Sequence, residues 1–420
     1  MATFVQETRG GNQMKLPKPS RRWLVVAGGI IIILCLGVAY AWGVFLLPIA
    51  EEFGWSRAET SLAQSILIFV FSTFMVVGGL LEKRIGPRLT ASIGGALVCL
   101  GWILAYKTQS KLWLYCTYGG IAGIGTGLGY LPAVSSGVKW FPDKKGMITG
   151  IIIFGFGFGS AIFARLSTMF IEMIGWRHTM LLYGASFGAL IIGAAQLLKP
   201  PPKGWEPVVA AANAQSNESF DFKPFEMIKT GSFMILFITY LMSMVAGMMT
   251  IGHINAFAQD AGYDANQAAT ALIILAIANG LGRVIFGAVS DKIGRKNTLV
   301  LLFILTAGSK FLLPSISELS AAYAIAGLIG LCFGGFLAVY PAATGDFFGM
   351  KNFGVNYGIV FIGYGCGCFI GPWLGGLVYD SMGSYQIAFK SAAGVAVAGA
   401  VLTYLFVKPP VQAVQEESIN

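Results

Sequence analysis

The chain has 420 residues, of which 56% are hydrophobic and 11% are charged, and its mean hydropathy is +0.72. Water-soluble globular proteins carry about 25% charged residues, so this composition excludes a soluble domain and indicates an integral membrane protein. The formal net charge of +9 follows from membrane topology, and no nucleic-acid partner is predicted.

Twelve apolar runs are long enough to cross a bilayer, which takes about 20 residues per helix. None shows the polar alternation of a membrane-spanning strand. The run that begins at Trp23 follows two arginines, but it is too long for a signal peptide and is predicted to be the first helix. The predicted helices span residues 24–48, 61–82, 89–106, 112–138, 147–171, 178–198, 230–257, 266–290, 297–314, 319–345, 354–379 and 384–407.

Lysine and arginine are distributed unevenly between alternate loops. Of 28 basic residues, 20 lie in the termini and the even-numbered loops, whereas four lie in the odd-numbered loops: Arg57, Lys107, Lys111 and Arg177. The positive-inside rule therefore predicts a multi-pass protein of the inner cell membrane with both termini in the cytoplasm.

The longest polar stretch between helices divides the chain into two halves. The segment from Gly79 to Arg88 recurs 208 positions later as Gly287 to Lys296. Duplicated halves around a central cavity are typical of transporters that alternate access. We predict an all-α protein of two six-helix pseudo-repeats, organised as an N-terminal arm (1–22), a first bundle (23–199), a cytoplasmic loop (200–229), a second bundle (230–408) and a tail (409–420).

Arg283 lies inside the eighth predicted helix, in an otherwise apolar run. A guanidinium in a membrane costs from about 2.5 to more than 10 kcal/mol, so such residues usually face a bundle interior or a wet cavity. No carboxylate lies within one helical turn, and the residue one turn back is the neutral Asn279. This pattern predicts an anionic substrate. The alternative is an ion pair with a neighbouring helix.

Other polar residues in the helices support weaker inferences. His253, near the outer end of the seventh helix, is one of two histidines. Because histidine changes charge near neutral pH, it is predicted to contact substrate and carry a proton, with a purely structural role as the alternative.

Arg165 and Lys310 are expected to extend toward the membrane surface. The six cysteines all fall in helices without metal spacing, so no metal or cofactor is predicted.

At these residues the chain resembles a known family. Gly287, Asp291, Gly294 and Arg295 match the loop signature of the major facilitator superfamily. The segment that opens the fifth helix, 140–150, is similar to the Tyr-Phe-x-Lys-Arg-Arg-x-Leu-Ala-x-Gly pattern of the monocarboxylate transporter family. The related oxalate/formate antiporters share the Gly-Val-Phe…Pro segment at 43–48.

The resemblance implies a substrate site. Arg283 stands at the position of the family's helix-eight arginine, and Asn279 stands where many members carry an aspartate. Mid-helix residues on spans that line the cavity in this superfamily complete the implied site: Tyr40, Ile153, Tyr340, Phe361 and Tyr364. Charged residues of the repeated loops and of the loop before the fifth helix are expected to latch the halves together: Asp291, Lys292, Arg295, Lys83, Arg84, Lys144 and Lys145.

Two departures from the family pattern narrow the function. Tyr364 occupies the position of the helix-eleven lysine of an oxalate transporter, and Val44 that of a helix-one lysine implicated in proton handling. One fixed cation favours one carboxylate over two. We predict a monomeric carrier, not an enzyme, that moves a short monocarboxylate such as lactate, pyruvate or acetate together with a proton. The alternatives are an oxalate/formate-type exchanger and a membrane sensor that binds a ligand without moving it.

Overall fold

The structure, a computed structural model, describes residues 19–202 and 221–409, except 252, 255–256, 259–261 and 316–317. Most of the predicted N-terminal arm, the middle of the predicted cytoplasmic loop and nearly all of the predicted tail lie outside these residues. The predicted domain boundaries therefore stay predictions.

All regular secondary structure in the described residues is helical. The first half contains α1 (Pro19–Leu36), η1 (Gly37–Ala41), α2 (Trp42–Phe53), α3 (Arg57–Ala105), α4 (Lys111–Leu114), η2 (Tyr115–Ala122), α5 (Gly123–Trp140) and α6 (Lys145–Ala195). The second half contains α8 (Pro224–Met227), α9 (Gly231–Ile251), α11 (Ala265–Ile293), α12 (Arg295–Leu312), η4 (Leu313–Ser315), α13 (Leu319–Phe348), α14 (Phe353–Met382) and α15 (Tyr385–Phe406).

Nine helical segments in the described ranges are long and apolar enough to cross a membrane. Two of them cross twice, because α3 bends at Gly86 (φ 83°) and α6 bends at Gly175 (φ 77°). Glycine adopts such positive φ values without steric cost. One more crossing combines α4, the π-helical η2 and α5. The prediction of 12 membrane-spanning helices is confirmed.

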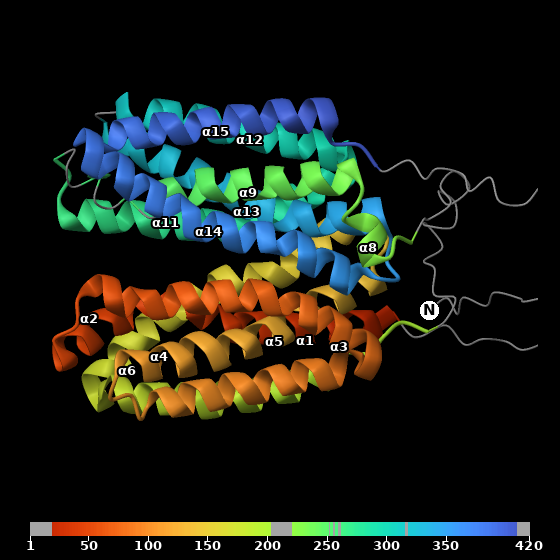
Figure 1. Ribbon diagram of the computed structural model, residues 1–420, viewed down its shortest axis with the longest axis horizontal. Helices are drawn as coiled ribbons and strands as arrows, with labels where there is room; N and C mark the ends of the chain where they lie inside the picture. Colours follow the sequence, from red (N-terminus) through yellow and green to blue (C-terminus); the bar gives the residue numbers. More distant parts are fainter. Residues whose placement is uncertain are drawn as a thin grey trace, which may run out of the picture.

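The helices form two bundles that lie side by side, α1 to α6 in one and α9 to α15 in the other (Figure 1). The described chain begins and ends at the same end of the molecule, which we call the terminal side, and the opposite end is the far side (Figure 1). This arrangement follows from an even number of crossings.

The bundles touch through α6 against α11 and α3 against α14. At these contacts glycine allows backbone to approach backbone. A Cβ atom on Gly150 would lie 2.1 Å from the carbonyl oxygen of Arg283, and one on Gly79 would lie 2.5 Å from the carbonyl carbon of Gly354. The two helix pairs therefore hold the halves together around the middle of the molecule.

Candidate functional site

Arg283 lies on α11 at the contact with α6 and is only 1% exposed. Its Nη1 donates to the carbonyl oxygen of Ile153 at 2.5 Å, and its Nε donates to Asn279 Oδ1, one turn earlier on α11, at 3.2 Å. Its Nη2 has no hydrogen-bond partner in the described residues. No carboxylate of the described chain lies within 4.0 Å of the guanidinium.

A buried cation without a counter-ion is costly, because neither water nor an opposite charge compensates its lost hydration. The expected alternative, an ion pair with a neighbouring helix, does not occur among the described residues. The unused Nη2 donor is therefore available to an anionic acceptor.

Arg283 forms the charged end of a small cavity between the halves. The space between the lining side chains is about 10 Å³, about what one water molecule needs, so the side chains are closed around the guanidinium in this structure. The rest of the lining is aromatic or aliphatic: Tyr40, Phe71, Tyr130, Ile153, Phe156, Leu337, Phe361 and Tyr364.

Tyr40 and Tyr364 join the two halves across this cavity. Their hydroxyl groups form a hydrogen bond. Tyr40 lies on η1, where the first crossing narrows to a 3-10 helix, and its ring packs edge-on against Phe156, with centroids 4.9 Å apart. Tyr364 stacks on Phe361 at 4.4 Å. The lining therefore combines apolar rings with two phenol hydroxyl groups.

The structure brings together five of the eight residues predicted to bind substrate: Arg283, Tyr40, Ile153, Phe361 and Tyr364 all line the same cavity. A sixth, Asn279, orients the guanidinium without lining the cavity.

The other two predicted residues lie outside the cavity lining. Tyr340 is 0% exposed and stacks on Tyr240, with ring centroids 4.0 Å apart. His253 directs Nε2 to the carbonyl oxygen of Pro372 at 2.9 Å, and its ring packs on Tyr385 at 5.2 Å. It therefore faces α14 and α15 instead of the guanidinium.

Four lining residues were not predicted: Phe71, Tyr130, Phe156 and Leu337. Aromatic and aliphatic residues occupy cavity faces and core faces of these helices alike, so composition does not separate the two. Only Tyr130, a tyrosine within a glycine-rich apolar helix, carries a recognisable signal.

Two other cations that the sequence places well inside predicted helices, Lys310 and Arg165, differ from each other. Lys310 was expected to extend toward the membrane surface, but it is 0% exposed and donates from Nζ to Thr250 Oγ1 at 2.6 Å. The reason is that its side chain points between α12 and α9 rather than outward. Arg165 is exposed on α6.

A polar cluster joins the halves on the terminal side, and we call it the C-half latch. The carboxylate of Asp291 accepts the backbone N–H groups of Gly146 (3.0 Å) and Met147 (2.9 Å) in the first turn of α6. An anion is stabilised at a helix N-terminus by the exposed N–H groups and the helix dipole. Arg295 binds Asp291 at 2.6 Å and, through Nε, Asp346 at 2.6 Å. Asp346 in turn pairs with Lys145 at 2.8 Å.

The first-half copy of this loop is weaker. Lys83, the counterpart of Asp291, donates one hydrogen bond to Asn352 Oδ1 at 3.0 Å. Arg84, Lys144 and Lys292, which were also predicted to latch the halves, are exposed and form no ion pair within the described chain. Asp346 was not predicted, although it is the one charged residue of α13, which was a usable signal.

Comparison with known proteins identifies the family. The family model of the Major Facilitator Superfamily matches residues 27–277 and 236–420. The chain belongs to the Major Facilitator Superfamily. It is therefore a multi-pass membrane protein and a secondary transporter, and not an enzyme.

Individual members of the superfamily resemble the chain over most of its length. It is 29% identical to the uncharacterized MFS-type transporter YhjX of Escherichia coli, covering 82% of this chain and 85% of the relative. It is 28% identical to the oxalate:formate antiporter of Oxalobacter formigenes, with 86% of each covered. It is 22% identical to monocarboxylate transporter 12-B of Danio rerio, with 92% and 87% covered.

The fold resembles a solved member of the superfamily. FucP, crystallised in the outward conformation, superposes with a TM-score of 0.68 at 15% identity, over 92% of this chain and 100% of FucP. This likeness concerns the fold alone.

Proposed function

We propose that this transporter carries short monocarboxylates, such as lactate, pyruvate or acetate, together with a proton by alternating access. The observation that supports this most is the unpartnered Nη2 of Arg283 at the end of a small, otherwise aromatic and aliphatic cavity. A carboxylate would accept from the guanidinium while a short carbon chain lies against the rings.

The number of charges favours one carboxylate over two. Arg283 is the one cation among the residues that line the described cavity, and Tyr364 is a neutral member of the same lining. A dicarboxylate would leave one anionic group without a counter-charge in a site of low dielectric constant, which is strongly unfavourable.

A second candidate is exchange of oxalate and formate. The relative named as an oxalate:formate antiporter is 28% identical, and monocarboxylate transporter 13 of Bos taurus is 27% identical. Overall identity therefore does not separate the two candidates, whereas the charge of the cavity favours the monocarboxylate.

In the proposed cycle the terminal side faces the cytoplasm, and the anion reaches Arg283 from the far side. Neutralising the guanidinium removes the cost of enclosing it, so the halves can rock and release the C-half latch.

His253 remains the proposed proton carrier, since its Nε2 is held by the Pro372 carbonyl and Nδ1 can take up a proton. The alternative is that the proton travels with the substrate carboxylate.

Uptake of labelled lactate into proteoliposomes under an inward proton gradient tests the proposal. Arg283→Ala should remain folded and lose roughly 30-fold to several thousand-fold in substrate affinity, the range for truncating one partner of a buried charge pair. Arg283→Lys, which keeps the charge but not the two-pronged geometry, should retain part of the activity.

Near-normal lactate uptake by Arg283→Ala would contradict the assignment. Counterflow of labelled oxalate against formate, at a rate above that of lactate in the parent protein, would instead favour the exchanger.

A further inference from the structure

The first membrane crossing passes the guanidinium of Arg283 and continues toward the far side. A Cβ atom on Gly157 of α6 would lie 3.8 Å from Arg283 Nη2, so Gly157 lies beside the guanidinium. A Cβ atom on Gly159 would lie 2.2 Å from the carbonyl oxygen of Leu34, so this part of α1 is close to the same level. Tyr40 follows six residues later, about 10 Å nearer the far side at the rise of a helix. Tyr40 therefore lines the cavity from the far side.

The same face of this crossing is exposed beyond Tyr40. Residues three, four and seven positions further along a helix share a face with the first. Here these residues are Gly43, Val44 and Leu47, and we call them the open face. Gly43 and Leu47 are exposed, and Val44 is half-buried. A Cβ atom on Gly43 would meet no other atom within 4 Å. A face that points into the cavity at Tyr40 is therefore accessible from Tyr40 to the far side.

One hydrogen bond stands between the open face and the guanidinium. The hydroxyl groups of Tyr40 and Tyr364 bond to each other across the two halves. Tyr40 is half-buried, whereas Tyr364 is 2% exposed. The other hydrogen bonds that join the halves within the described ranges involve Arg283 itself or lie on the terminal side. Because the lining side chains are closed around the guanidinium, a solute reaches Arg283 from the far side only after the two hydroxyls part.

We propose that the Tyr40–Tyr364 pair is the far-side gate of the cavity. When the gate is closed, the two hydroxyls satisfy each other. When it opens, both face the open site, where water or a substrate oxygen can replace the lost partner, so opening leaves no buried hydroxyl unpaired. One neutral hydrogen bond is weaker than the charge-assisted contacts of the C-half latch. The far side therefore opens more readily than the terminal side. This inference concerns access and does not depend on the identity of the substrate.

Thiol chemistry above and below the pair tests the gate. Gly43→Cys places a thiol on the open face, and Ile153→Cys places one in the cavity that Ile153 lines. Both are treated with a membrane-impermeant methanethiosulfonate in right-side-out vesicles, with the parent protein correcting for native cysteines. The thiol of Gly43→Cys should react readily, whereas that of Ile153→Cys should react only while the gate is open. Leu337→Cys, which lines the same cavity from the second half, repeats the measurement if Ile153→Cys does not fold.

Phenylalanine substitutions show whether one shared hydrogen bond holds the gate. Tyr40→Phe and Tyr364→Phe each remove a hydroxyl and keep the aromatic ring. Because the gate is closed in this structure, each should speed the reaction of the Ile153→Cys thiol about fivefold, which corresponds to the roughly 1 kcal/mol of one hydrogen bond. The double variant should gain no more than either single variant, because both remove the same bond. The reaction of the Gly43→Cys thiol should stay unchanged.

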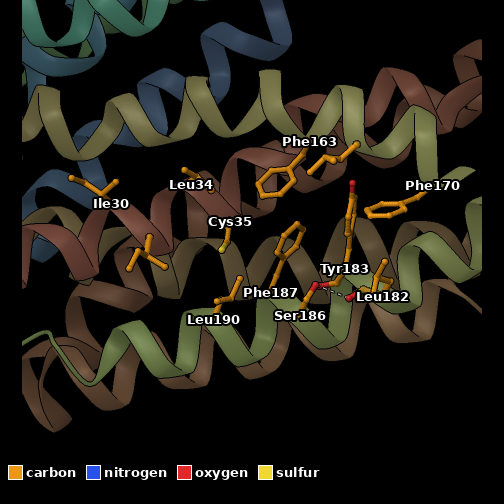
Figure 2. Close-up of a pocket in the computed structure, with 12 residues that line it drawn as sticks. Ile30, Leu34, Cys35, Phe163, Phe170, Leu182, Tyr183, Ser186, Phe187 and Leu190 are labelled. Atoms are coloured by element: carbon orange, nitrogen blue, oxygen red, sulfur yellow. Dashed lines mark hydrogen bonds between the residues drawn. The ribbon is translucent and has the colours of Figure 1, made fainter.

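Tyr183→Phe is the matched control. Tyr183 is also a buried tyrosine, and its hydroxyl lies 3.0 Å from Ser167 Oγ of the same helix, α6. Figure 2 shows Tyr183 beside Phe163 and Phe187, in an apolar pocket between α1 and α6. This hydrogen bond lies within the first half and does not join it to the second. Its loss should therefore leave both thiol reaction rates unchanged.

Three results would overturn the proposal. An unchanged rate for the Ile153→Cys thiol in either phenylalanine variant would mean that the pair does not close the cavity. A double variant that gains the product of the two single effects, roughly 25-fold, would mean that the hydroxyls act independently. A Gly43→Cys thiol that does not react would mean that the open face meets lipid or protein and does not lead to the cavity.

Discussion

Asp291→Asn should shift the transporter toward a state that is open on the terminal side. The substitution preserves shape but removes the charge that accepts two N–H groups of α6 across the interface. Losing one charge-assisted hydrogen bond costs about 1.5–3 kcal/mol, and the interaction with the helix dipole adds about 0.3–1 kcal/mol. Because these contacts exist only while the halves are closed, a net effect of about 2–3 kcal/mol predicts a shift of roughly 30- to 150-fold in the equilibrium.

Pulsed electron–electron distance measurements can detect this shift. Spin labels at Lys144 and Lys351 report on the two halves, since both side chains are exposed on the terminal side, and replacing the exposed Cys116 removes a competing label site. In Asp291→Asn the longer distances should become the major population.

The matched control is Glu51→Gln, which removes an exposed carboxylate outside the latch and should leave the distances unchanged. An Asp291→Asn distribution identical to that of the parent would mean that this contact does not hold the terminal side closed.

Three other substitutions test the site and its surroundings. Tyr364→Lys should improve competition by oxalate relative to lactate, because it adds a second cation to the cavity, and unchanged oxalate competition in an active variant would show that the position does not face the substrate. Lys310→Met should raise the midpoint of thermal unfolding, since burying an amine without a counter-ion costs free energy that an apolar chain of similar length avoids, and a lowered midpoint would indicate that the amine is required. His253→Ala should flatten the rise in uptake at acidic external pH, and substrate-driven proton influx at the parental rate would exclude His253 as the carrier.

Much of the fold and the charged centre of the site could be predicted from the sequence, because the bilayer imposes simple rules. Helix length and apolar composition set the number of crossings. A guanidinium that cannot face lipid must turn inward, so Arg283 was predictable from a single helix. The segment from Gly79 to Arg88 recurs at Gly287 to Lys296, and this repeat identified the second-half loop that contains Asp291 and Arg295.

The other lining residues of the site depend on how each helix is rotated and which helices it contacts. The sequence of a single helix does not determine either. Lys310 and Arg165 have similar sequence surroundings, yet one is enclosed by α9 and α12 and the other is exposed. Tyr340 and Tyr130 are both mid-helix tyrosines, but only Tyr130 lines the cavity. Such differences arise from tertiary packing and are invisible to the pattern of a single helix.

The C-half latch and the Lys83 contact all lie on the terminal side of the molecule. In the proposed cycle these contacts favour the state that is closed on the terminal side, and they must break before that side opens. Because the carrier favours one of its two states, the half-saturating concentration and the maximal rate of transport can each differ between the two membrane faces. Conservation of energy requires the ratio of maximal rate to half-saturating concentration to be equal for the two faces when no gradient is applied. A scarce solute is therefore moved at the same rate from either face, and the imbalance shows itself only as the carrier approaches saturation.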